Sequence, residues 1–193
     1  MSGLDIKGRK IIFITGGARS GKSTFALKEA SKISGNKAFI ATAVRAYGDM
    51  PLPDEEMKER IEKHKKQRGN DWVTYEEPLK IADLVESIKN KYSVILIDCL
   101  TLWLSNIMHS DYDLHKEIKN LIDTLKNCRG VLQYAPTQKS ELFIVANEVG
   151  MGIVPENEIA RRFRDMAGLL NQKIAEVADE VYMVVAGITI KIK

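Results

Sequence analysis

The sequence contains few cysteines, and this scarcity excludes a disulfide-based fold. Its 193 residues include only Cys99 and Cys128, whose spacing fits no metal-ligand pair. A reducing compartment is the simplest expectation, so we place the protein in the cytoplasm. A chain of this length can bury a sizeable core without disulfides or a structural metal. We therefore expect a single domain over residues 1–193.

Long apolar runs and a strong net charge are also missing. No apolar run reaches about 18 residues and no signal peptide precedes the first expected strand, so we expect no membrane span. The formal net charge is +3, from 29 basic and 26 acidic residues. Such a small excess indicates a mixed, solvated surface, and we expect no nucleic-acid partner.

Short, continuously apolar runs alternate along the chain with helical patterns. The expected strands are residues 10–15, 37–41, 93–98 and 141–146. The expected helices are residues 22–33, 54–68, 78–90 and 112–127. Continuous apolar runs suit strands that are covered on both faces. The pattern predicts an α/β fold with a mostly parallel, doubly wound sheet.

The C-terminal part has a different pattern. A long amphipathic helix is expected over residues 158–178. Two β runs follow, over residues 180–185 and 188–193, and Ala186-Gly187 separates them. We expect this pair to form a β-hairpin at the edge of the sheet.

The motif G-x-x-x-x-G-K-[ST] directly follows the first expected strand and opens a helix. This context is the one a P-loop needs, and it makes a chance glycine-rich turn the weaker explanation. Its backbone N–H groups should face the phosphates of GTP or ATP, with Lys22 on the β- and γ-phosphates and Ser23 on Mg²⁺. The fold is thus predicted to be of the P-loop NTPase type. The predicted phosphate-binding residues are Gly16, Gly17, Ala18, Arg19, Ser20, Gly21, Lys22 and Ser23.

Asp98 ends an apolar strand, the position at which P-loop enzymes carry a metal-binding carboxylate. Taken alone, an aspartate at the end of a strand is as often a cap for the helix that follows. Together with the P-loop, it becomes our second candidate ligand of Mg²⁺.

The expected helix over residues 54–68 places Arg60, His64 and Arg68 one turn apart on one face. Neighbouring positive charge keeps an imidazole neutral and nucleophilic, and guanidinium groups can hold a phosphate against it. That combination suits a covalent nucleotidyl-histidine intermediate. From spacing alone, however, a solvated charged face with an incidental histidine is the simpler interpretation. His109 and His115 have no metal spacing, and we expect them on the surface.

The glycine-containing loop over residues 147–157 follows the fourth expected strand. In open α/β sheets ligands bind beyond the carboxyl ends of the strands, so this loop should face the site, although a purely structural turn remains an alternative. Arg161, Arg162 and Arg164 follow at the start of the long helix. One of them could contact phosphate, or all three could be solvated.

Several of these segments resemble the adenosylcobinamide kinase/adenosylcobinamide-phosphate guanylyltransferase family. They are GGARSGKS, ATA at 41–43, DEEMKERIEKH, DCLTLWLSN and the block from NEVGMGIVPEN to the C-terminus. The resemblance implies a bifunctional enzyme of cobalamin biosynthesis. Such an enzyme phosphorylates adenosylcobinamide with ATP or GTP. It then transfers GMP from GTP to the product, giving adenosylcobinamide-GDP and pyrophosphate.

The resemblance also implies roles for individual residues. His64 matches the histidine that carries GMP in this family, which reverses the interpretation from spacing alone. The residues that correspond to guanine-nucleotide contacts are Thr42, Ala43, Val44, Gln67, Arg68, Gly69, Asn70, Glu76 and Thr101. The sequence departs from the family pattern in two places. The loop at 44–53 is longer than in relatives, and Arg68-Gly69 stands where relatives often have Arg-Pro.

The alternatives from the sequence are a kinase that does not use His64, a recombinase-like NTPase module and a regulatory nucleotide-binding protein without turnover. The small net charge argues against the second, and Asp98 with His64 argues against the third. We also expect a homo-oligomer, because an exposed helix face could pack against a copy of itself.

Overall fold

A seven-stranded sheet forms the centre of the protein in the computed structural model, which describes residues 8–43, 69, 71–129 and 140–193. The strand order is β3-β2-β4-β5-β1-β6-β7. The strands are β1 (Lys10–Gly16), β2 (Lys37–Ala41), β3 (Trp72–Glu76), β4 (Val94–Asp98), β5 (Glu141–Asn147), β6 (Glu180–Val185) and β7 (Ile188–Lys191).

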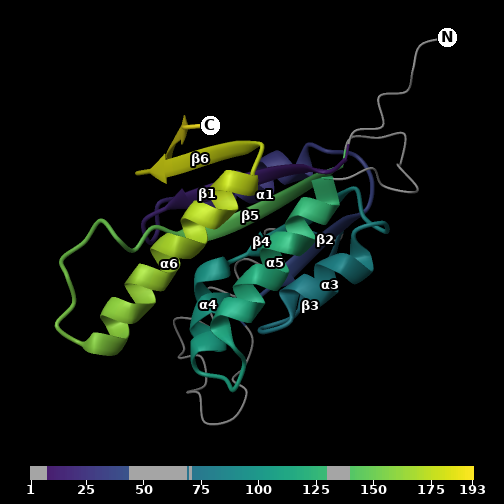
Figure 1. The fold of residues 1–193 in the computed structure, drawn as a ribbon. Helices are drawn as coiled ribbons and strands as arrows, with labels where there is room; N and C mark the ends of the chain where they lie inside the picture. Colours follow the sequence, from purple (N-terminus) through teal and green to yellow (C-terminus); the bar gives the residue numbers. More distant parts are fainter. Residues whose placement is uncertain (1–7, 44–68, 70, 130–139) are drawn as a thin grey trace.

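Helices cover both faces of this sheet (Figure 1). They are α1 (Lys22–Ser31), α3 (Ile81–Ile88), α4 (Leu100–Met108), α5 (Leu114–Arg129) and α6 (Glu158–Val177). Ala26 and Ala30 of α1 pack on one face, against Ile12 and Ile14 of β1. The buried side chains of α3, α5 and α6 pack on the other face, with Ile11 and Phe13 of the same strand. Because β1 is covered on both faces, Ile11–Ile14 form a continuous apolar run instead of alternating with polar residues.

All neighbouring strands pair in parallel except β6 and β7, which form an antiparallel hairpin. The last residue of β1, Gly16, pairs with Asn147 of β5 and with Val184 of β6. In the other half of the sheet Ala41 of β2 pairs with Asp98 of β4. The carboxyl ends of the strands therefore lie along one edge, where ligands of open α/β sheets bind.

The sequence predicted the doubly wound α/β fold and the C-terminal hairpin, and both are confirmed. Two elements were missed. The strand β3 lies at the edge of the sheet, and its exposed Val73, Thr74 and Glu76 weaken the apolar pattern of a strand. The helix α4 is only nine residues long and mainly apolar, so its 3.6-residue period is hard to recognise in the sequence. The expected helix at 112–127 begins at Leu114 and ends at Arg129, while the expected helix at 54–68 lies outside the described residues.

Buried Arg9 ties the start of β1 to its neighbours. Its side chain is 1% exposed, and its guanidinium donates to the backbone carbonyls of Ser93 (3.2 Å), Glu141 (2.9 Å), Lys89 (2.7 Å) and Tyr92 (2.5 Å). Burial lowers the pKa of Arg9 to about 10, so the group stays charged at neutral pH. One side chain thus satisfies carbonyls from the ends of α3, β4 and β5.

We predict that Arg9→Leu lowers the free energy of unfolding by about 3 kcal/mol, because buried carbonyls lose a charged donor. Arg129 provides the matched control, since its ion pair with Asp179 (2.6 Å) lies on the surface. Arg129→Leu should cost less than about 1 kcal/mol. Urea unfolding of the three proteins measures both values. Equal losses in the two variants would contradict the structural role of Arg9.

Candidate active site at the carboxyl edge of the sheet

The loop between β1 and α1 has the geometry of a phosphate-binding loop. The chain leaves β1 at Gly16, where φ is +152°, and enters α1 through Gly21, where φ is +97°. Glycine favours both conformations because it has no Cβ. No side chain caps the N-terminus of α1. The first N–H groups of this helix, and the positive end of its dipole, therefore face the loop.

The C-terminal hairpin holds this loop against the sheet. A Cβ on Gly16 would lie 2.3 Å from the carbonyl oxygen of Val184 in β6. At the other end of the loop, the N–H of Gly187 donates to the carbonyl of Ser20 at 2.9 Å. Gly16 is therefore required by close packing, whereas a Cβ on Gly17 would meet nothing within 4 Å.

The loop brings its polar groups together while its outer turn remains exposed. Lys22 is 7% exposed, and its ammonium donates to the carbonyl of Gly17 at 3.1 Å. The hydroxyl groups of Thr15 and Ser20 are buried and have no hydrogen-bond partner among the described residues. Gly17, Ala18 and Arg19 are exposed. Buried donors and a buried ammonium group in and next to one loop suit an anion such as a nucleotide phosphate.

Asp98 ends β4 on the same edge and is half-buried. The N-cap residue of α4 is Cys99, so Asp98 precedes the cap position and does not occupy it. The pKa of the Cys99 thiol is raised to about 11, first by burial and then by Asp98, while Lys22 lowers it. The Asp98 carboxylate and the Lys22 ammonium group therefore both lie near the Cys99 thiol.

The donor set fits a magnesium ion bound with a nucleotide. Ser23 lies in the first turn of α1 and is half-buried, as Asp98 is. Among the residues that the structure describes, no three His, Cys, Asp or Glu side chains form a metal-binding group. Such a group is not needed here, because a P-loop site supplies a hydroxyl and a carboxylate and the phosphates supply further oxygens.

A hydrogen-bond cluster behind Asp98 connects β2 with α4. The Thr42 hydroxyl accepts from the N–H of Cys99 (2.9 Å) and donates to its carbonyl (2.8 Å). The side-chain amide of Asn106 donates to the carbonyls of Thr42 (3.0 Å) and Pro78 (3.1 Å). Because Thr42 is fully buried, these bonds fix the backbone next to Asp98.

The sequence predicted Thr42 only as a nucleotide contact and gave Asn106 no role. The detectable signal was an amide side chain in the mainly apolar helix LTLWLSNIM. A half-buried amide of this kind needs partners, and here it donates to two backbone carbonyls.

The loop at 147–157 adjoins the phosphate loop, as predicted. The N–H of Glu148 donates to the carbonyl of Gly16 at 2.9 Å, and the N–H of Asn147 donates to the Thr101 hydroxyl at 2.6 Å. Thr101 of α4 is therefore engaged in holding this loop, whatever it contacts in a nucleotide. Of the three arginines that follow, Arg161 binds backbone carbonyls of the loop, so it has a structural role.

The structure brings together only part of the predicted site. The phosphate loop, Thr42, Ala43, Asp98 and Thr101 lie at the carboxyl ends of β1, β2 and β4. Glu76 ends β3 on the same edge, whereas exposed Gly69 precedes β3 at the opposite edge. His109 and His115 are exposed, as expected. The predicted residues outside the described part of the chain are Val44, His64, Gln67, Arg68 and Asn70.

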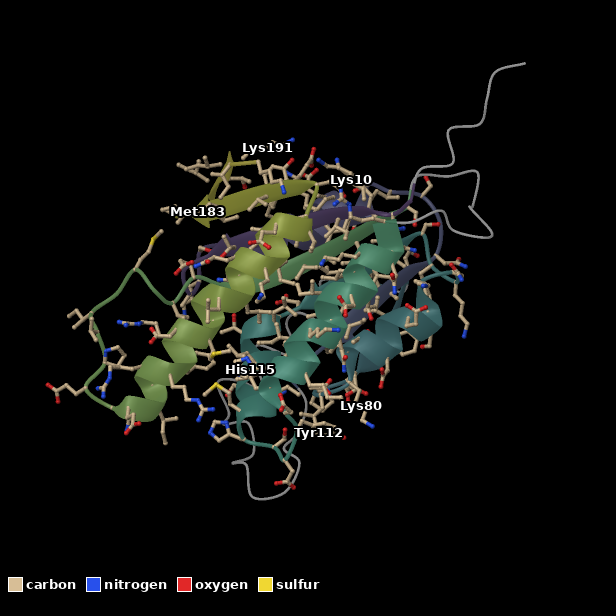
Figure 2. All side chains as sticks on the ribbon, viewed as in Figure 1. Lys10, Lys80, Tyr112, His115, Met183 and Lys191 are labelled. Atoms are coloured by element: carbon tan, nitrogen blue, oxygen red, sulfur yellow. The ribbon has the colours of Figure 1, made fainter. Side chains whose placement is uncertain are left out.

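A groove of about 520 Å³ lies at the other end of the sheet. It is lined by the first residues of three strands, Lys10, Glu141 and Glu180, together with Phe25 and Glu29 of α1. Figure 2 shows Lys10 and Met183 apart from each other along the upper strands, and Met183 pairs with Thr15 beside the phosphate loop. This groove is therefore separate from the phosphate-binding edge, and the P-loop geometry identifies the candidate active site.

Comparison with known sequences identifies the family. The sequence profile described as "Cobinamide kinase / cobinamide phosphate guanyltransferase" matches residues 12–192. The chain belongs to this family. This single match includes the phosphate loop, Asp98 and the C-terminal hairpin.

Individual family members support the assignment along the whole chain. The "Bifunctional adenosylcobalamin biosynthesis protein CobU" of Escherichia coli is 35% identical over 201 residues, covering 95% of this chain and 99% of that protein. The CobP protein of Pseudomonas aeruginosa is 37% identical, with coverage of 93% and 95%. The CobU protein of Salmonella typhimurium is 36% identical, with coverage of 95% and 99%.

Solved structures share the fold at low sequence identity. The flagellar accessory protein FlaH of Methanocaldococcus jannaschii has a TM-score of 0.51 at 12% identity, covering 97% of this chain and 79% of that one. The RadB recombinase has a TM-score of 0.50 at 12% identity, with coverage of 92% and 74%. These matches concern the fold alone. Among the described helices, none is long and apolar enough to cross a membrane.

We predict that Lys22→Ala lowers nucleotide turnover by about 10²–10³-fold, because a buried ammonium group at the phosphates is lost. Lys28→Ala, on an exposed position of the same helix, should stay near the wild-type rate. Release of nucleoside diphosphate in the presence of acceptor measures the effect. Near-wild-type turnover in Lys22→Ala would remove the P-loop from the mechanism.

Proposed function

We propose that this protein is a bifunctional transferase that phosphorylates adenosylcobinamide and then transfers GMP to the phosphate. The observation that carries the proposal is a complete phosphate loop, with Asp98 on the same edge, in a chain that matches the cobinamide kinase/guanyltransferase family over residues 12–192. In the first reaction the acceptor hydroxyl attacks the γ-phosphorus of ATP or GTP, and the nucleoside diphosphate leaves. In the second, GMP passes from GTP to the new phosphate, and pyrophosphate leaves.

The phosphate loop supplies what the kinase reaction requires. Phosphoryl transfer depends mainly on positioning and on stabilising charge, and little covalent chemistry is left to the protein. The N–H groups at the start of α1 bind phosphate oxygens, and Lys22 adds a positive charge with restricted access to water. Ser23 and Asp98 would hold Mg²⁺, which when bound neutralises charge that develops on the phosphates.

The second reaction requires a group that can accept GMP, and we assign this role to His64. Its nitrogen attacks the α-phosphorus of GTP and releases pyrophosphate; an oxygen of the cobinamide phosphate then attacks the same phosphorus and releases the histidine. Arg60 and Arg68, four residues to either side, favour a neutral ring and bind the α-phosphate. His64 lies outside the described residues. What supports the assignment is the R-I-x-x-H motif of the family and the position of Thr42–Ala43 on the phosphate edge, from which the chain enters this segment.

Contacts to the guanine nucleotide complete the proposal. We place them at Thr42, Ala43, Val44, Glu76 and Thr101 and at the segment Gln67, Arg68, Gly69 and Asn70. The location of Gly69 at the opposite edge from the phosphate loop makes it the weakest member of this set. We further propose a cytoplasmic homo-oligomer.

The alternatives make different predictions about covalent chemistry and partners. A kinase that does not use His64 would form no labelled protein with α-labelled GTP. A recombinase-like module would require a basic stripe for nucleic acid, and the net charge of +3 gives little support. The similarity to RadB does not change this conclusion, since at 12% identity it concerns the fold alone.

We predict that Asp98→Asn shifts the magnesium titration of both activities to higher concentration, because a neutral amide binds a divalent cation more weakly than a carboxylate. Asp83→Asn, at an exposed position of α3, is the matched control and should leave the titration unchanged. Initial rates over a range of Mg²⁺ concentrations distinguish the two variants. An unchanged titration in Asp98→Asn would assign this residue a structural role.

His64→Ala should separate the two activities. We predict that the variant forms no acid-labile, base-stable protein adduct with α-labelled GTP and makes no adenosylcobinamide-GDP. It should still form adenosylcobinamide phosphate, because the kinase step needs no nucleophilic side chain. His115→Ala, at an exposed position of α5, should keep both activities. An adduct that persists in His64→Ala would place the intermediate on another residue, and loss of both activities with an intact fold would make His64 part of a shared binding site.

A further inference from the structure

Three apolar side chains project into solvent from the loop that follows β5. Met151 is 75% exposed, Ile153 is 96% exposed and Val154 is 59% exposed. We refer to these three residues as the apolar arc. In Figure 1 the green segment that contains them extends away from the sheet before α6 begins.

Hydrogen bonds at both ends of the loop hold the apolar arc in this exposed position. The Glu148 carboxylate accepts from the N–H of Gly150 at 2.7 Å. On the other side the Arg161 guanidinium donates to the carbonyls of Pro155 and Glu156, and the Asn157 side chain caps α6 through the N–H of Ala160 (3.0 Å). A loop fixed in this way has already lost conformational entropy, yet its apolar side chains stay out of the core. This arrangement favours a surface that binds an apolar partner.

The apolar arc lies close to the phosphate site. Glu148 donates its N–H to the carbonyl of Gly16, the first residue of the phosphate loop. Met151 follows only three residues later, so its Cα lies within about 11 Å of that of Glu148, given at most about 3.6 Å per residue. A large molecule that presents a hydroxyl to the phosphate loop would therefore reach the apolar arc as well.

We propose that the apolar arc binds the corrin ring of the acceptor, which rests on the function proposed above. A corrinoid combines a wide, flat macrocycle and methyl-bearing edges with flexible amide arms, one of which ends in the reacting hydroxyl. The ring is too large for the phosphate loop and needs an apolar surface beside it. The nucleotide phosphates would not bind an apolar surface, since they bind N–H groups and cations. The apolar arc thus provides affinity for the acceptor, and the phosphate loop provides the chemistry.

The test compares Ile153→Ser with Ile192→Ser. Ile192 is also exposed, at 60%. Its backbone N–H donates to the carbonyl of Val181 at the start of β6, so Ile192 lies far from the phosphate loop. We expect Ile153→Ser to raise the KM for adenosylcobinamide about tenfold, which corresponds to losing one buried isoleucine contact, while kcat at saturation changes less than about threefold. The dissociation constant for GTP should stay at the wild-type value. Ile192→Ser should leave all three quantities unchanged.

Equilibrium dialysis with cobinamide, followed by its visible absorbance, gives a second measurement that does not depend on turnover. A tenfold weaker binding to Ile153→Ser, with sedimentation velocity unchanged, supports the proposal. Equal corrinoid binding by Ile153→Ser and Ile192→Ser would overturn it. So would a change of sedimentation coefficient in Ile153→Ser with normal corrinoid affinity, which would identify the apolar arc as a contact with a second copy. Failure of the wild-type protein to bind or phosphorylate any corrinoid would instead reject the proposed function itself.

Discussion

The pairing of β1 with β5 on one side and β6 on the other is the constraint on which the candidate site depends. Gly16 is the last residue of β1, and it lies between Asn147 and Val184 in this pairing. The carbonyl of Val184 occupies the space that any side chain at Gly16 would need. The C-terminal hairpin, which is remote in sequence, therefore determines the path of the phosphate loop. Binding at this loop is accordingly coupled to the folding of the whole sheet.

A single phosphate site can serve two different transfers if the reacting groups come from other parts of the chain. In the proposed mechanism, Lys22 and the start of α1 bind the phosphates in both transfers, whichever phosphorus is attacked. The segment with His64 begins directly after Thr42 and Ala43, and Thr42 is locked to Cys99 next to Asp98. The loop with the apolar arc begins directly after Asn147 and Glu148. In the proposed mechanism, the segment that carries the nucleophile and the loop that would bind the acceptor therefore both follow strands that end beside the phosphate loop.

The parts of the structure that follow from local patterns could be predicted from the sequence. Each of these patterns lies within about ten consecutive residues: the apolar runs in β1, β4 and β5, the P-loop motif and the Ala186-Gly187 turn. The edge strand β3 could not be predicted, because its exposed residues remove the apolar signal. The Thr42–Cys99 hydrogen bonds span 57 positions, and no local pattern reports such a contact. The roles of Glu148 and Arg161 in holding their loop also arise from tertiary geometry, which the composition of the loop does not encode.

The burial of both cysteines has a practical consequence for labelling. Burial raises the pKa of Cys99 to about 11 and also raises that of Cys128, so neither thiol ionises appreciably near neutral pH. Maleimide reagents act on exposed thiolates, and the native chain therefore gives them little to react with. One cysteine introduced on the surface would carry a spin label or dye alone, with both native cysteines left in place. Pairs of such sites would allow distances from the phosphate edge to residues 44–68 to be measured during each half of the reaction.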